Sequence, residues 1–126
     1  HQLMKKIKSD FKVHSNDFQP EILDTATAGD VELQKELMRL FLLDIEDIKA
    51  LHLGSADDLR ALAHRCKGQC ASLGFVGPSR RMMEIQDLCD RSEHLGSAFI
   101  EEHGIQIIKL MECSADILQK HVDNLS

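Results

Sequence analysis

Apolar side chains recur at spacings of three and four residues along most of the chain, and this periodicity most limits its fold. Residues at these spacings share one face of an α-helix, so the pattern predicts helices with one buried side. One such stripe is Leu33, Leu37, Leu40, Phe41, Ile45 and Ile48. Another is Ile100, Ile107, Met111, Ala115, Leu118, Val122 and Leu125. No segment alternates apolar and polar residues as a strand does, so the predicted fold class is all-α.

Glycines and helix caps between the stripes divide the chain into five predicted helices. They are a short helix over about 17–29 and long helices over about 30–51, 55–73, 79–93 and 97–125. Four long amphipathic helices with short connections are typical of an antiparallel four-helix bundle, here with a short additional N-terminal helix. Residues 1–16 carry four lysines and are predicted to be a linker or N-terminal extension. The bundle domain is therefore expected to span residues 17–126.

Length and charge exclude several classes of function. A chain of 126 residues fits one domain, and 15 Lys+Arg against 21 Asp+Glu give a net charge of −6. This balance argues against nucleic acid as a partner, because phosphate binding needs a basic surface. No run approaches the roughly 18 apolar residues of a membrane span, so direct insertion into a membrane is not expected. The size favours a small module that docks to a partner, a monomer when isolated.

The four cysteines allow a metal-binding alternative. Cys66 and Cys70 are spaced i, i+4 and could help to hold zinc, with His64 and His94 as further ligands. However, His64 and Cys66 differ by about 200° around a helix, so they cannot share an ion with Cys70. The spacing also matches no familiar zinc module. The favoured interpretation is no metal site: the thiols are small core residues. Without a signal peptide, the expected compartment is the reducing cytoplasm.

The predicted helix over 55–73 has an unusual outer face. Its apolar stripe is Leu59, Leu62, Cys66, Cys70 and Leu73, and His64 lies almost opposite the mean direction of that stripe. The neighbours of His64 at i−3, i+4 and i+7 are Ala61, Gly68 and Ala71, where an exposed helix normally carries long polar side chains. Glycine in a helix interior costs about 1 kcal/mol relative to alanine. Close approach of another surface is the natural reason for it.

This arrangement suits phosphoryl chemistry. Imidazole is partly unprotonated at neutral pH, and the neutral ring is a good nucleophile toward phosphorus. A phosphoryl group on His64 would add about two negative charges, which Lys67 at i+3 is placed to offset. Arg60 and Arg65 flank His64 in the sequence and are expected to face the incoming group. The residues therefore predict a nucleophilic histidine that a partner can cover.

The segment HRCKGQCASLG, residues 64–74, resembles the H-x-x-K-G signature of histidine-containing phosphotransfer (HPt) domains. The resemblance extends to FQPEIL (18–23), LFLLD (40–44) and MEIQDLCDRSE (83–93), and covers roughly residues 17–126. It implies that His64 is the phosphoacceptor and that Lys67 supports the charge of the phosphoryl group. It also implies that a partner docks over Ala61, Arg65, Gly68, Gln69 and Ala71. Cys66 and the Gln69-Cys70 pair depart from the family pattern, which affects the expected choice of partner more than the role of His64.

The resemblance further implies the partners. HPt domains receive the phosphoryl group from the aspartate of a receiver domain and pass it to another receiver. They have no kinase activity, and the Mg²⁺ of the reaction belongs to the receiver. The chain contains no P-loop or kinase glycine-rich loop, in agreement. The missing start methionine and the lysine-bearing residues 1–16 suggest the cytoplasmic tail of a membrane-bound hybrid sensor kinase, whose own kinase and receiver domains would be partners. A receiver-docking adaptor that carries no phosphate is a second alternative.

Overall fold

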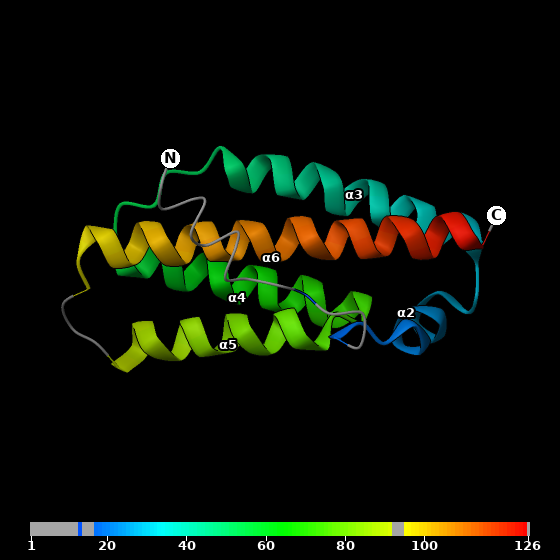
Figure 1. Ribbon diagram of the computed structural model, residues 1–126, viewed down its shortest axis with the longest axis horizontal. Helices are drawn as coiled ribbons and strands as arrows, with labels where there is room; N and C mark the ends of the chain where they lie inside the picture. Colours follow the sequence, from blue (N-terminus) through cyan, green and yellow to red (C-terminus); the bar gives the residue numbers. More distant parts are fainter. Residues whose placement is uncertain (1–12, 14–16, 92–94, 126) are drawn as a thin grey trace.

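Helices make up most of the described residues, which are 13, 17–91 and 95–125 of the computed structural model. They are α2 (Pro20–Thr27), α3 (Val31–Lys49), α4 (Ala56–Leu73), α5 (Val76–Arg91) and α6 (Ser97–Asn124). Figure 1 shows the four long helices alongside one another, with the short α2 at one end. The described residues contain no β-strand, only an isolated bridge between Phe18 and Phe75. The all-α prediction is therefore confirmed.

Side-chain caps fix where α3 and α4 begin. The Asp30 carboxylate accepts a hydrogen bond from the backbone N–H of Leu33 at 3.2 Å. At the start of α4, the Ser55 hydroxyl oxygen accepts one from the N–H of Asp58, also at 3.2 Å. Two aspartates in the first turn of α4 stabilise the helix, because their negative charges lie at the positive end of the helix dipole. These caps agree with the predicted starts of both helices to within one residue.

The connection between α4 and α5 is much tighter than predicted. Helix α5 begins at Val76, so the prediction of a start near Ser79 is wrong. Gly77 and Pro78 lie inside its first turn, where the missing N–H of proline costs no helical hydrogen bond. Gly74 ends α4 with φ 94°, a left-handed conformation that suits glycine. Only Gly74 and Phe75 separate the two helices.

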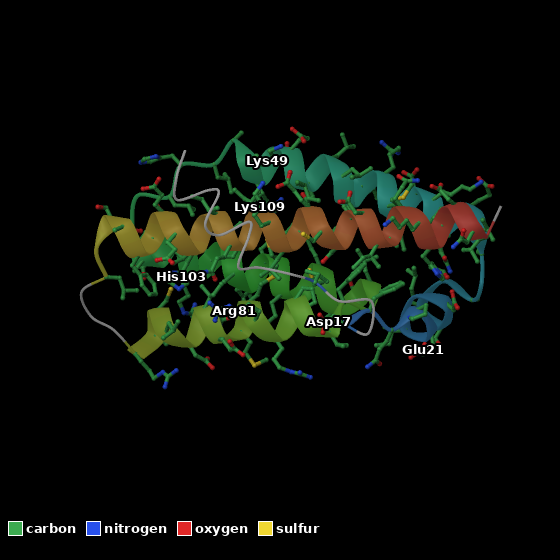
Figure 2. All side chains as sticks on the ribbon, viewed as in Figure 1. Asp17, Glu21, Lys49, Arg81, His103 and Lys109 are labelled. Atoms are coloured by element: carbon green, nitrogen blue, oxygen red, sulfur yellow. The ribbon has the colours of Figure 1, made fainter. Side chains whose placement is uncertain are left out.

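A segment that precedes α2 crosses this connection. The N–H of Gln19 donates a hydrogen bond to the carbonyl oxygen of Gly74 at 2.8 Å, and the Phe18 and Phe75 rings stack at 4.5 Å. The Asp17 side chain, labelled in Figure 2, lies beside Gly77, where a Cβ would lie 2.5 Å from the carboxylate. These contacts hold residues 17–19 against the start of α5.

The core lies between the long helices and contains one buried polar link. Its fully buried members include Leu59, Met82, Ile85, Ile107 and Leu118, one or more from each of α4, α5 and α6. Gln34 of α3 is also buried, and its amide donates to the Asp24 carboxylate at 2.9 Å and to the Thr27 hydroxyl at 3.0 Å. This link attaches α2 to α3.

At the other end of α3, a salt bridge from Lys49 to Glu112 joins the helix to α6. Lys49 of α3 and Lys109 of α6 both lie within 4 Å of the Glu112 carboxylate, at 3.7 and 3.3 Å (Figure 2).

The predicted linker, residues 1–16, lies outside the described residues except for Val13, which packs against the core. Within the described part of the chain, none of the helices has the length and apolar character needed to cross a membrane.

Candidate functional site

Helix α4 presents His64 to solvent, as the periodicity predicts. The five residues of the predicted core stripe are all buried, while His64, Ala61, Gly68 and Ala71 are exposed. The 64–71 stretch lies in the C-terminal half of an 18-residue helix whose opposite face is buried, so packing of that face sets its orientation. Among the described residues, His64 has no hydrogen-bond or ion-pair partner. Its ring is therefore open to an incoming group.

Gly68 has no side chain, so together with Ala61 and Ala71 it leaves a bare surface around His64, that is, a helix face without long side chains. A Cβ built at this position would have no heavy atom within 4 Å, so internal packing does not require a glycine here. The residue nevertheless costs about 1 kcal/mol of helix propensity relative to alanine. Folding alone therefore does not account for Gly68.

Lys67 lies one turn beyond His64 and is directed toward α5. Its Nζ donates a hydrogen bond to the Gln86 Oε1 atom at 3.3 Å. The Ser79 hydroxyl of α5 donates to the carbonyl oxygen of Lys67 at 3.1 Å, which fixes the backbone at the same place. The partner of Lys67 is a neutral amide, so the side chain is not paired with a carboxylate. Sequence reasoning did not single out Gln86, although the residue lies within the 83–93 segment that resembles the HPt family.

The two arginines beside His64 differ from the prediction. Each is held by an aspartate of a neighbouring helix: Arg65 by Asp44 of α3 at 2.6 Å, and Arg60 by Asp90 of α5. The hydrogen bond from Arg60 to Asp90 raises the pKa of the guanidinium. The sequence predicts that both arginines face an incoming phosphoryl group, whereas in the structure each guanidinium is already paired with a carboxylate of a neighbouring helix. Their partners are 21 and 30 residues away, beyond the range of helix periodicity.

Gln69 lies apart from His64. It is half-buried and lines a hollow of about 150 Å³ between α3 and α4, with Leu37, Leu40 and Ser72 among the lining residues. Its Oε1 atom is buried and has no hydrogen-bond partner among the described residues. Residues 64 and 69 differ by about 140° around the helix, so Gln69 and the histidine do not share a face. Of the predicted docking residues, Ala61, Gly68 and Ala71 share the helix face of His64, whereas Arg65 and Gln69 are directed toward α3.

The cysteines of α4 are core residues. Cys66 and Cys70 are fully buried, and the Cys70 Sγ lies 3.5 Å from the Met111 Sδ. Burial raises the pKa of both thiols to about 12. The described residues contain no cluster of three or more side chains suited to a metal ion. His94, the fourth ligand of the metal-binding alternative, lies outside the described residues.

We expect these two thiols to react at least about a thousandfold more slowly than an exposed cysteine toward Ellman's reagent at pH 8, because the thiolate is the nucleophile. Absorbance at 412 nm, followed before and after addition of guanidinium chloride, measures this, and peptide mapping assigns the modified residues. Full denaturation is the internal control, since Cys66 and Cys70 should then react at once. Rapid modification of either residue in the folded protein would contradict the burial described above.

Comparisons with known proteins do not assign a family. The chain matches no protein-family model, no curated protein and no solved structure. The functional argument therefore depends on the geometry around His64.

Proposed function

We propose that this protein is a phosphorelay intermediate of the HPt type, built as an antiparallel four-helix bundle. His64 accepts a phosphoryl group from a receiver-domain aspartate and passes it to the aspartate of another receiver. The observation that carries the proposal is an exposed histidine on a bare helix surface, with the unneutralised Lys67 one turn away. A buried histidine would be unable to approach an aspartyl phosphate held by another protein.

The chemistry needs few groups from this chain. A ring nitrogen of His64 attacks the phosphorus of the aspartyl phosphate, the phosphorus–oxygen bond to the aspartate breaks, and the carboxylate leaves. The second transfer reverses these roles, with a carboxylate as nucleophile and the imidazole as leaving group. Lys67 offsets part of the charge on the phosphoryl group in both directions. The Mg²⁺ belongs to the receiver, so this domain needs no cofactor of its own.

The surface around His64 favours docking of a receiver. Ala61, Gly68 and Ala71 leave room for its active site to approach the ring. Exposed apolar side chains lie on the helices to either side, with Leu40 of α3 47% exposed and Met83 of α5 49% exposed. A surface with small residues at its centre and exposed apolar side chains around them suits a transient protein complex.

The substitution Gly68→Glu tests this docking surface. We expect a folded protein, because the position is open, and phosphotransfer slowed by about tenfold or more through steric and charge repulsion of the partner. Rapid-quench kinetics with a phosphorylated receiver domain measures the rate. Gly96→Glu is the matched control, since Gly96 is also exposed and open around its Cβ position. Equal transfer rates for both variants would contradict the proposed docking surface.

The relay itself is tested with ³²P-labelled receiver domains. The label should move from the phosphorylated receiver to this protein, and then to a second, unlabelled receiver added after the first is removed. We also propose that the domain is monomeric, acts in the cytoplasm and serves a hybrid sensor kinase. Receivers from such kinases are therefore the first choice for this experiment. Complex formation without label transfer would instead indicate a docking adaptor. If no receiver in a panel binds the protein or transfers label to it, the proposal is contradicted.

A further inference from the structure

His64 is bracketed by two bridges from α4 to α5. One turn after it, Lys67 is bound to Gln86, and one turn before it, Arg60 is bound to Asp90. Side chains three or four residues apart on a helix lie about 5–6 Å apart at Cβ, so Arg60 and Lys67 are both neighbours of His64 on the helix surface. The two bridges differ in charge: the Lys67 partner is a neutral amide, whereas the Arg60 partner is a carboxylate.

The Arg60–Asp90 bridge is suited to opening. Both side chains are 45% exposed, and ion pairs at such positions contribute little to stability because water and salt screen them. A phosphoryl group on His64 would place about two negative charges within reach of the guanidinium. Arginine binds phosphate oxygens in a bidentate manner, so the new anion competes well with Asp90. Arg65 is not in an equivalent position, since it lies about 100° from His64 around the helix and is held toward α3.

We propose that Arg60 is a second phosphoryl-binding residue and that Asp90 limits how strongly Arg60 binds the phosphoryl group on His64. In the unphosphorylated protein Asp90 holds Arg60. In the phosphorylated protein Arg60 moves to the phosphoryl group, and the unpaired Asp90 carboxylate opposes it by repulsion. Asp90 thus keeps the phosphohistidine from becoming too stable to pass its phosphoryl group onward. This inference rests on the proposed function and adds a regulator of the same site.

The sign of each substitution follows from the charges. Asp90→Asn removes the competitor and the repulsion, so the phosphohistidine should last longer. Arg60→Gln removes the cation and leaves Asp90 unpaired, so it should hydrolyse faster. We expect a change of roughly two- to fivefold in half-life in each direction, from a unit charge near a screened phosphoryl group. A purely structural role of the bridge would instead move both variants in the same direction.

Phosphoramidate allows the test without a known receiver. A ring nitrogen of His64 attacks its phosphorus, the phosphorus–nitrogen bond breaks, and ammonia leaves with the ring proton. The ³¹P NMR signal then gives the half-life at neutral pH and, by titration, the second ionisation of the phosphoryl group. Asp90→Asn should lower the pKa of that ionisation and Arg60→Gln should raise it, with the double variant between them. Arg39→Gln, which breaks an exposed pair with Glu36 on α3, is the control and should match the unchanged protein.

The outcomes separate this inference from the proposed function. If both substitutions leave the half-life and the pKa of the phosphohistidine unchanged, or shift them in the same direction, the role of Arg60 and Asp90 is overturned. The proposed function is not affected by that result. Failure of the unchanged protein to give a phosphohistidine signal overturns the proposed function and this inference with it. Opposite shifts in the two variants, absent in Arg39→Gln, support the inference.

Discussion

Replacing His64 with glutamine is expected to abolish acceptance of a phosphoryl group and to leave the fold intact. The side chain is exposed and has no hydrogen-bond partner among the described residues, so its loss should change the free energy of unfolding by no more than about 0.5 kcal/mol. Glutamine keeps a polar side chain of similar length but has no nucleophilic ring nitrogen. Label transfer from a phosphorylated receiver measures acceptance, and urea unfolding measures stability.

The matched control is His52→Gln. His52 is also exposed and lies in the connection between α3 and α4, where it lines a hollow with Ala61 and Arg65 but does not lie on the α4 helix that carries His64. This variant should accept the phosphoryl group at the rate of the unchanged protein. If the His64→Gln variant accepts label as well as the His52→Gln variant, another residue is the acceptor and the account of α4 is wrong.

Gly74→Ala should have the largest effect on stability, a loss of about 2–4 kcal/mol. Two causes add. The residue has φ 94°, which an alanine adopts only with strain, and a Cβ there would overlap the backbone carbonyl oxygen of Gln19. A carbonyl oxygen in a hydrogen-bonded segment cannot rotate away as a flexible side chain can. Relief of the overlap would break the contacts that hold residues 17–19 over the α4–α5 connection.

Gly29→Ala separates the two causes. Gly29 also has positive φ, 73°, but nothing lies within 4 Å of its Cβ position, so its substitution should cost only about 1 kcal/mol. Urea unfolding of both variants, with equal m-values as a check on two-state behaviour, gives the difference. Equal losses for the two alanine variants would contradict the close approach of Gln19 to Gly74.

The stability of this connection bears on function because it fixes the register of α5 against α4. With only Gly74 and Phe75 between the helices, Gln86 lies opposite Lys67, and Asp90 lies opposite Arg60. A longer loop would allow α5 to slide by a turn and separate these pairs. The tight turn thus positions the α5 side chains that hold the cations around His64.

The sequence predicted the helices and the exposure of His64 well, because both depend on local periodicity. The stripe of Leu59, Leu62, Cys66, Cys70 and Leu73 determines which face of α4 is buried, and the opposite face follows from helix geometry. Ser55 likewise marks a helix start by its own chemistry. These features require no knowledge of how the helices pack.

Features that depend on packing between helices were missed. The start of α5 at Val76 was misjudged because Gly77 and Pro78 resemble a loop but also fit a first helical turn. Asp44, Gln86 and Asp90 were not assigned to the site, since their partners on α4 are 19 to 30 residues away. Arg60 and Arg65, which the sequence places beside His64, accordingly each belong to an interhelical ion pair that the sequence does not predict.

The most direct test of the central claim is to locate the phosphoryl group. The protein, phosphorylated by a receiver or by phosphoramidate, is digested and analysed by tandem mass spectrometry at neutral pH, where phosphohistidine survives. We predict one modified residue, His64, among the seven histidines of the chain. A phosphoryl group on any of the other six histidines, or on none, would contradict the account.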